Sequence, residues 1–279
     1  MCFFKKSLSA AFAASILALS SPTSAGELEQ ANKQVVQAAL TSVFDAQNVS
    51  LVPTYYHNDY IQHSPEIEDG QAGITKAIKQ MQEAGLKPSR EIARIVAEND
   101  LVAVHSRVKI GGHSAIVADI FRLEEGKIIE HWDTTQPETP AEKSANGNSM
   151  LDGGGNAALK VSTAALERNK SNVKAFIEQG FAGDKKLLAS LFGDEYIQHN
   201  PMVPNGKEVI LGFLEKGGFP ATIHQIVAQG DLTFALVEYP AFNNAAIDIF
   251  RHDAQGKIVE HWDIVQKIPE TLAHKNGMF

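Results

Sequence analysis

The sequence predicts an α+β fold that is present twice in one chain. The strongest observation is a stretch that recurs: Asp-Ile-Phe-Arg, a turn, then Gly-Lys-Ile-Ile/Val-Glu-His-Trp-Asp, at residues 119–133 and again at 248–263. The second is the order of patterns in each copy, where helical periodicity comes first and β-branched runs follow. Helices followed by an antiparallel meander form an α+β unit with its helices on one side of the sheet.

The repeat extends well beyond this hairpin. Tyr60-Ile-Gln-His63-Ser-Pro65 returns as Tyr196-Ile-Gln-His199-Asn-Pro201, and Gly70 matches Gly206. The stretch between the copies is rich in Pro, Gly, Asn and Ser, a composition typical of flexible linkers. We therefore expect a first domain at 26–137, a flexible linker at 138–158 and a second domain at 159–279.

The first copy shows how each element is expected to form. A helix is predicted at 27–44, where Val36, Leu40 and Val43 form one apolar stripe, and another at 70–84, ended by Gly85. A short helical piece at 49–56 leads to the Tyr-Ile-Gln-His segment. Four strands then follow, separated by Gly- and Asn-rich turns, at 90–97, 101–110, 114–123 and 127–135.

Residues 1–25 have the layout of a secretory signal peptide. Lys5 and Lys6 precede an apolar run at 8–19, and small residues lead up to Ala25. The run is short for a membrane span, although a retained anchor is the alternative. The only cysteine, Cys2, would leave with this segment, so thiol chemistry is not expected in the mature protein. The predicted location is secreted or periplasmic.

Charge limits the partners. The formal net charge is −8, and Lys and Arg do not cluster. An acidic chain without a basic patch is a poor match for nucleic acid or an anionic membrane surface. We expect neither partner once the signal is removed.

The duplicated hairpin also indicates a site. A three-residue loop in the first copy and a four-residue loop in the second predict the same cross-strand pairs, Asp119 with His131 and Asp248 with His261. Alternation then places Asp133 on the same strand face as His131. Two carboxylates and an imidazole beside apolar side chains indicate a pocket wall. The alternative is an exposed polar face with a salt-bridged histidine.

These motifs resemble the SnoaL-like polyketide cyclase family. The similarity rests on Tyr-Ile-Gln-His-x-Pro, on Asp100-Leu-Val-Ala-Val-His105 and on the Glu-His-Trp-Asp ending, and it covers nearly all of both halves after residue 25. The family belongs to the nuclear transport factor 2-like superfamily. The resemblance implies a tandem duplication of a cone-shaped α+β barrel, with a curved sheet around a pocket that helices close. This fold hosts cyclases, isomerases, hydrolases and non-catalytic binders.

The resemblance also implies a chemistry. A pocket carboxylate near the end of the sheet acts as general acid/base, and the matching residues are Asp133 and Asp263. The expected catalytic set is Asp133, His131 and Asp119 in the first copy, with Asp263, His261 and Asp248 in the second. The expected substrate contacts are His63, His105 and Tyr60, and in the second copy His199 and Tyr196. No cofactor is needed for such proton transfer.

The predicted function is thus an exported SnoaL-like protein that binds a small carbonyl compound. It would catalyse an aldol-type cyclisation, an isomerisation or a lyase reaction. The alternatives are a non-catalytic periplasmic small-molecule binding protein and a scaffold whose pockets are unused. A metal site is a further alternative, but the histidines are dispersed with no close pair on one element, so no metal is expected.

The outer face of each sheet predicts how the halves sit together. Alternation places Ile120, Ile128 and Trp132 on this face, and the second copy repeats the pattern. Left exposed, such residues would form a sizeable apolar patch. We therefore expect the two domains to pair as an intramolecular pseudo-dimer.

Overall fold

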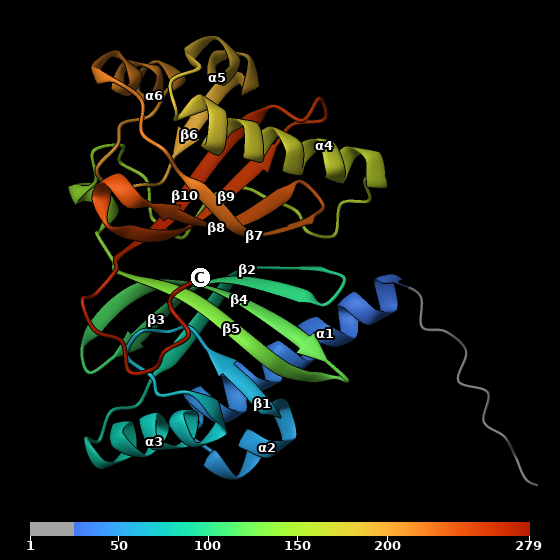
Figure 1. The fold of residues 1–279 in the computed structure, drawn as a ribbon, viewed down its shortest axis with the longest axis vertical. Coiled ribbons are helices and arrows are strands. Elements are labelled where there is room, and N and C mark those ends of the chain that lie inside the picture. Colours follow the sequence, from blue (N-terminus) through green and yellow to red (C-terminus); the bar gives the residue numbers. More distant parts are fainter. Residues whose placement is uncertain (1–24) are drawn as a thin grey trace, which may run out of the picture.

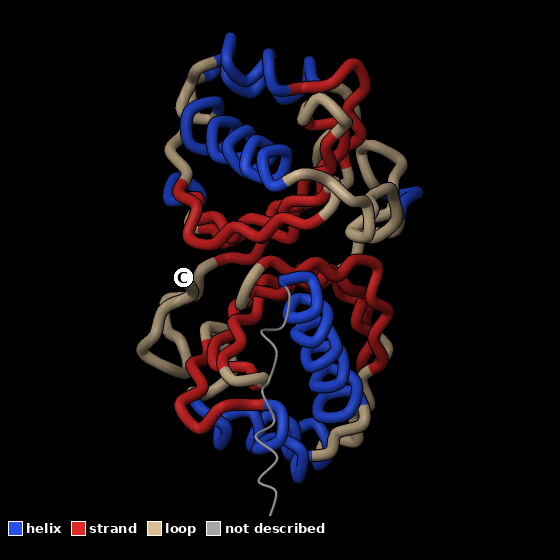
Figure 2. Tube along the Cα trace, turned by 90° about the vertical axis from the view of Figure 1, so that its right-hand side faces the viewer, coloured by secondary structure: helices blue, strands red, loops and turns tan. Residues whose placement is uncertain are grey.

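The computed structural model describes residues 25–279, so the predicted signal peptide lies outside the described residues except for Ala25, which begins helix α1 (Ala25–Ala39). The two domains stack along the long axis of the molecule (Figure 1). Their sheets face each other at the centre, and helices lie towards both ends (Figure 2). Within residues 25–279, no helix is long and apolar enough to cross a membrane.

The first domain has the predicted order of helices followed by strands. Helix α1 continues as a π-helical turn, Leu40–Asp45. The remaining elements are α2 (Val52–Tyr55), β1 (Tyr56–Gln62), α3 (Gly70–Glu83), β2 (Ser89–Glu98), β3 (Leu101–Ile110), β4 (His113–Glu124) and β5 (Lys127–Pro137). Strand β1 is an addition to the predicted meander. It pairs in parallel with β5, so the sheet is mixed, with the order β1-β5-β4-β3-β2.

The second domain repeats this architecture. Its elements are α4 (Thr163–Lys174), a π-helical turn (Ala175–Gly180), α5 (Lys185–Leu191), β6 (Phe192–Gln198), α6 (Lys207–Phe213), β7 (Thr222–Gln229), β8 (Leu232–Tyr239), β9 (Asn244–His252) and β10 (Ile258–Lys267). The order β6-β10-β9-β8-β7 matches that of the first sheet. The duplicated α+β fold is confirmed, but a closed barrel is not. Both described sheets are open because their two edge strands do not pair with each other.

Each domain has its own core between helices and sheet. In the first domain the predicted stripe along α1 and its π-helical turn is buried, with Val36, Leu40 and Val43 at most 3% exposed, and Ile74 and Ile78 of α3 join it. Burying one such side chain contributes about 1.5–3 kcal/mol. This packing holds the helices against the concave face of the sheet.

The predicted hairpin register is wrong by two residues. Asp119 lies opposite Asp133, and His131 lies opposite Phe121. The turn is tighter than expected, because Glu125 and Gly126 both adopt positive φ, as in a two-residue type I′ hairpin. A bulge follows, where the pairing passes from Leu123–Ile128 to Arg122–Glu130. The second hairpin has the same shift, with Asp248 opposite Asp263.

The bulge also moves one side chain in each copy to the other face. Ile128 and Ile258 were expected on the outer face with the tryptophans, but both pack in the helix-side cores. One extra residue in a strand reverses the alternation beyond it. Trp132 and Trp262 stay on the outer face, where the alternation resumes.

The two outer faces share one apolar core. Trp132 and Trp262 are 2% and 0% exposed, and they belong to the same cluster. The other members come from both sheets and from the segment between the domains: Val96, Ala103, Ile116, Ala118, Ile120, Met150, Leu151, Val227, Leu232, Phe234, Leu236, Ile247, Ile249 and Ile264. The outer sheet faces are thus buried against each other.

The segment 138–158, expected as a flexible linker, is packed rather than free. Met150 and Leu151 are buried in the central cluster. The guanidinium of Arg94 donates to the carbonyl oxygens of Leu151 (2.6 Å), Asp152 (3.2 Å) and Gly154 (3.0 and 3.1 Å). The Gly- and Asn-rich composition of the segment 138–158 therefore allows it to pack closely against both sheets.

Candidate functional site

The first domain encloses a cavity of about 550 Å³ between the concave face of its sheet and its helices. Apolar side chains line most of it, among them Leu40, Phe44, Ile67, Met81, Val117 and Phe121. Asp119, His131 and Asp133 line it together, with one atom of each within 4.8 Å of the others. The structure therefore brings the predicted catalytic set together inside a cavity, despite the error in register.

Hydrogen bonds fix the imidazole of His131. Its Nε2 lies 3.0 Å from Asp119 Oδ1, and its Nδ1 lies 3.0 Å from Gln62 Oε1. The orientation of the Gln62 amide is set because Oε1 also accepts the backbone N–H groups of His63 and Ser64. Both ring nitrogens thus face acceptors, a geometry that suits an imidazolium.

Asp133 lies beside this imidazole with one oxygen free. Ser64 Oγ donates weakly to Oδ2 across 3.4 Å, while Oδ1 has no hydrogen-bond partner among the described residues. Burial raises the pKa of Asp133, and the charge of Asp119 adds to the rise, whereas His131 opposes it. A carboxylate with a raised pKa and a free oxygen can exchange a proton with a bound ligand.

The second domain has the same arrangement in a cavity of about 550 Å³. His261 lies 2.9 Å from Asp248 Oδ1 and 3.1 Å from Gln198 Oε1. Asn200 donates to Asp263 Oδ2 across 2.8 Å, and Oδ1 of Asp263 again has no partner in the described part of the chain.

The protonation of this second set is shifted more clearly. Burial raises the pKa of Asp263 to about 6, with His261 opposing and Asp248 adding to the rise. Burial works against a charged His261, but the hydrogen bond to Asp248 and the charges of both carboxylates raise its pKa overall. The pKa of each group is therefore raised above its ordinary value.

The two cavities differ in what supports the distal carboxylate. In the first, the Arg90 guanidinium lies 3.5 Å from Asp119 Oδ2 and donates to Ser106 Oγ across 2.7 Å. In the second, the Tyr239 hydroxyl donates to Asp248 Oδ2 across 2.9 Å. The first cavity thus has a cation at its wall where the second has a neutral phenol.

Their apolar linings differ too. The second cavity is bordered by an aromatic group that has no counterpart of the same size in the first: Phe176, Phe181, Phe213, Phe219 and Phe242. Phe219 packs against Phe181 and Phe242 with ring centres 5.0 and 5.1 Å apart. Such a wall suits a flat apolar ligand.

Three predicted substrate contacts of the first domain do not line its cavity. His63 points to the other side of the sheet, stacked on Trp132 with ring centres 5.0 Å apart. His105 is fully buried between the sheets, where Arg94 contacts its Nδ1 at 3.2 Å. Tyr60 is a core residue, edge-on to Tyr56.

In the second domain one of the two predicted contacts reaches the cavity. Tyr196 lines it, and its hydroxyl accepts a hydrogen bond from Gln198 Nε2 at 3.2 Å. His199 does not, because it stacks on Trp262 with ring centres 4.6 Å apart. The chain leaves strands β1 and β6 just before these histidines, which turns both towards the domain interface.

Sequence reasoning missed six side chains that contact the catalytic sets: Gln62, Ser64 and Arg90 in the first domain, and Gln198, Asn200 and Tyr239 in the second. Gln62 and Gln198 could have been found, since they stand in the repeated Tyr-Ile-Gln-His motif and share a strand face with the tyrosine two residues earlier. No repeated motif indicates Arg90 or Tyr239, because the two residues stand at positions that do not correspond in the two domains.

The catalytic sets could also be considered as metal ligands. In each domain one atom from each of the three residues lies within 4.8 Å of the others: Asp119, His131 and Asp133, and Asp248, His261 and Asp263. In both sets, however, the two ring nitrogens already bond to a carboxylate and a glutamine oxygen. A metal would have to break one of these bonds, so the donor sets fit proton transfer better.

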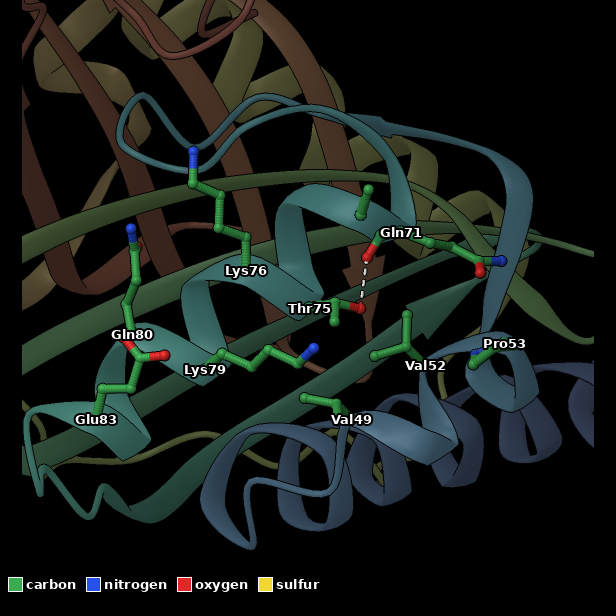
Figure 3. Close-up of a pocket in the computed structure, with 10 residues that line it drawn as sticks. Val49, Val52, Pro53, Gln71, Thr75, Lys76, Lys79, Gln80 and Glu83 are labelled. Atoms are coloured by element: carbon green, nitrogen blue, oxygen red, sulfur yellow. Dashed lines mark hydrogen bonds between the residues drawn. The ribbon is translucent and has the colours of Figure 1, made fainter.

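A separate surface groove lies over helices α2 and α3 (Figure 3). It is lined by Gln71, Thr75, Lys76 and Lys79, and Thr75 Oγ1 donates to the carbonyl of Gln71 at 2.9 Å. None of the predicted site residues borders it.

The chain is similar to one family profile and to several solved structures. The profile of the SnoaL-like domain matches residues 36–131. No curated protein matches the chain. Among solved structures, TsrD from Streptomyces laurentii is 21% identical, with 38% of this chain and 89% of that chain covered and a TM-score of 0.33.

Two further structures are similar to about the same extent. An M. tuberculosis LEH-like epoxide hydrolase is 19% identical, covering 38% of this chain and 78% of that chain, with a TM-score of 0.33. An NTF-2 like protein of unknown function from Burkholderia xenovorans LB400 is 19% identical, covering 39% and 84%, with a TM-score of 0.34. The matched profile runs from α1 into β5, so the first domain is similar to the SnoaL-like domain over most of its length, and the second domain repeats the strand order of the first.

Proposed function

We propose that each cavity binds a small carbonyl compound and that Asp133 and Asp263 catalyse proton transfer on it without a cofactor. One observation carries this proposal. In both domains a carboxylate of raised pKa lies at the wall of a cavity, with one oxygen unpaired and a histidine beside it. A surface salt bridge would have neither the enclosure nor the free oxygen.

The reaction class follows from what such a carboxylate can do. Its free oxygen takes a proton from the carbon next to a carbonyl, which leaves an enolate and a neutral carboxylic acid. The enolate carbon can then attack a second carbonyl and form a carbon–carbon bond. Alternatively, the delocalised enolate is reprotonated at a different carbon from the one that lost the proton. The acid returns its proton to the product oxygen or carbon. Cyclisation and isomerisation both balance in this way.

His131 and His261 support the charge that develops. An imidazolium close to Asp133 or Asp263 stabilises the carboxylate form and then the enolate oxygen. Asp119 and Asp248 hold the ring through Nε2, as the buried carboxylate does in other acid/base sites. Gln62 and Gln198 hold it through Nδ1.

A non-catalytic binder is the second candidate, and the aromatic wall of the second cavity favours it there. Phe213 and Phe242 are each 48% exposed at the rim, so a ligand could bury them without any chemistry. In that case the first cavity alone would turn over substrate.

The setting of this activity is also proposed. The layout of residues 1–25 supports export to the periplasm or the medium. The shared core around Trp132 and Trp262 supports an intramolecular pseudo-dimer that is monomeric in solution, with its cavities on opposite sides. Static light scattering tests the latter: a mass close to that of one chain is expected, and twice that mass would contradict it.

The test of function begins with the ligand. Protein purified from its native compartment under non-denaturing conditions is expected to carry a small carbonyl compound, identified by mass spectrometry. Asp133→Asn and Asp263→Asn are then compared with the unaltered chain for turnover of that compound. Each is expected to abolish the activity of its own cavity and to retain ligand binding. If both variants keep full turnover, the acid/base proposal fails.

A further inference from the structure

Two seven-residue segments outside the helices and strands share a sequence pattern. They are strap A, residues 145–151 (Ala-Asn-Gly-Asn-Ser-Met-Leu), and strap B, residues 273–279 (Ala-His-Lys-Asn-Gly-Met-Phe). Both have Ala first, Asn fourth, Met sixth and a large apolar residue last. Strap A follows the last strand of the first domain, and strap B follows that of the second. The duplication therefore includes these segments.

Each strap binds the opposite domain. In strap B, the Asn276 side chain donates to the Gln62 carbonyl oxygen across 2.9 Å, and the Gly277 carbonyl accepts from His63 Nδ1 at 2.9 Å. The backbone N–H of Ala273 donates to Pro65 O across 2.8 Å. These contacts lie on the first domain, although strap B is connected to the second.

Strap A makes the same three bonds to the second domain. Asn148 donates to the Gln198 carbonyl oxygen at 2.9 Å, and His199 Nδ1 donates to the Ser149 carbonyl at 2.7 Å. The third bond joins the residues at the matching positions, Ala145 N and Pro201 O, at 2.7 Å. The two straps are thus exchanged between the domains with the same register.

His63 and His199, which do not line the cavities, bind the straps instead. His63 Nδ1 lies 2.9 Å from the Gly277 carbonyl oxygen of strap B, and its Nε2 lies 3.0 Å from Glu130 Oε1. His199 bonds Glu260 in the same way at 2.8 Å. The sixth residue of each strap is buried, with Met150 2% and Met278 3% exposed. Each strap is therefore held both by hydrogen bonds and by the burial of one methionine side chain.

The strap sites share their backbone with the catalytic sets. Gln62 accepts strap B on its main-chain oxygen and holds His131 with its side chain. The next contact is similar: strap residue His274 donates to the Ser64 carbonyl at 2.9 Å, and Ser64 Oγ reaches Asp133. In the second domain, Asn146 of strap A donates to the Asn200 carbonyl at 2.6 Å.

We propose that each domain carries a peptide-binding site for a linear Ala-x-x-Asn-x-Met-apolar segment, and that the bound strap positions the catalytic set of the domain it sits on. Strap B, which follows the second domain, positions the catalytic set of the first. Strap A, which follows the first domain, positions that of the second. The positioning part rests on the proposed function of the cavities, whereas the peptide site does not.

The peptide site is tested in trans. A chain that ends at residue 272 is titrated with the synthetic peptide Ala-His-Lys-Asn-Gly-Met-Phe, and binding is measured by calorimetry. The peptide is expected to bind, and replacing its Asn by Ala is expected to weaken it about tenfold, as loss of one buried hydrogen bond does. The full chain, whose site is filled, is expected not to bind. Equal binding to both chains, or none to either, overturns the proposal.

Paired substitutions in the full chain test whether each strap binds the domain proposed for it. They remain informative if the shortened chain does not fold. Asn276→Ala is expected to speed hydrogen exchange of the His63 and Ser64 amides, which bond to Gln62 Oε1, and to leave those of His199 and Asn200 unchanged. Asn148→Ala is expected to do the reverse. Exchange that rises in the domain that the altered strap does not contact, or in both domains equally, would contradict it.

NMR of the His131 and His261 rings tests whether a strap positions the catalytic set. In Asn276→Ala, the ring-nitrogen chemical shifts of His131, which report its hydrogen bonds to Gln62 and Asp119, are expected to change, while those of His261 stay the same. In the shortened chain, added strap B peptide is expected to restore them. Unchanged His131 shifts would leave the strap as packing alone and overturn the positioning role. None of these readouts needs turnover, so a failure of the proposed function would not be confused with a failure of strap binding.

Discussion

Gln62 Oε1 accepts a hydrogen bond from His131 Nδ1 across 3.0 Å while it also accepts two backbone N–H groups. A neutral imidazole has one donor and one acceptor nitrogen, so it could not satisfy both Gln62 and Asp119. The glutamine therefore favours a charged ring beside Asp133.

The first prediction follows from this bond. Gln62→Met keeps the side-chain length but removes the acceptor, so His131 is free to adopt a neutral tautomer. Turnover in the first cavity is expected to fall about 100- to 1,000-fold, the range of one electrostatic contribution to the transition state. Ring-nitrogen NMR of His131 checks the protonation state directly. Gln198→Met is the matched control, which should change His261 alone; an unchanged His131 spectrum in Gln62→Met would count against the idea.

The second prediction concerns pH. Asp263 must be ionised to act as a base, so turnover in the second cavity is expected to rise with pH through about 6, the value to which burial raises its pKa. Stability should move the other way. Between its unfolded pKa and about 6, the folded state holds a proton that the unfolded state has lost, so stability falls as pH rises through this window.

Asp263→Asn removes that loss. At pH 7 the variant is expected to be more stable than the unaltered chain by on the order of 1 kcal/mol, or roughly 2–4 °C in melting temperature. The difference should shrink towards pH 4. Calorimetric melting at several pH values decides it, and a variant that melts lower at pH 7 would show that Asp263 stabilises the fold.

The third prediction separates the ligands of the cavities. Arg90 places a guanidinium at the first cavity, where hydrogen bonds to a charged ligand contribute about 1.5–3 kcal/mol. Arg90→Ala is expected to weaken binding of carboxylate-bearing aromatic ketones about tenfold or more, with little effect on neutral ones. Tyr239→Phe should affect neither class in the first cavity. Arg107→Ala, which removes a charge paired with Glu138 outside the cavity, is the control. Equal losses in Arg90→Ala and Arg107→Ala would point to net charge instead.

The fourth prediction measures the interface. Trp262 is fully buried, donates Nε1–H to Asp152 O at 2.8 Å and lies 4.0 Å below the Arg94 guanidinium. Trp262→Ala is expected to lower the free energy of unfolding by about 3–5 kcal/mol. Trp132→Ala should cost about 1 kcal/mol less, because its Nε1 has no hydrogen-bond partner in the described structure. Urea unfolding measures both, and losses near zero would mean that the sheets contribute little by pairing.

The fifth prediction tests export. Cleavage after Ala25 is expected to leave a mature chain that starts at or near Gly26. N-terminal sequencing of protein from the native host checks this, and an intact Met1 in the cytoplasm would contradict it.

Much of the fold could be predicted because alternation and helical periodicity depend on side chains alone. Asp119, His131 and Asp133 were placed on one face correctly even though their pairing was wrong, since a shift by two residues preserves the face. The bulge that reverses Ile128 depends on the backbone near the turn, which alternation does not encode.

The contacts around His63 could not be predicted for a different reason. Strap B lies more than 200 residues away in sequence, and the bonds between Gly277 and His63 and between Asn276 and Gln62 need the second domain to be in place. Only Ala, Asn and Met recur between the straps, in segments whose composition resembles linkers. Three matches in seven residues become informative once both are seen to make the same bonds.

The exchanged straps also determine when each strap site can be filled during synthesis. A ribosome releases residues 26–137 long before it makes Ala273–Phe279, so the first domain must wait with its strap site open until translation is almost finished. The second domain meets the opposite situation, because residues 145–151 emerge before any of its strands. Its docking segment is present from the outset. The first half of the protein to be made is therefore the last to be completed.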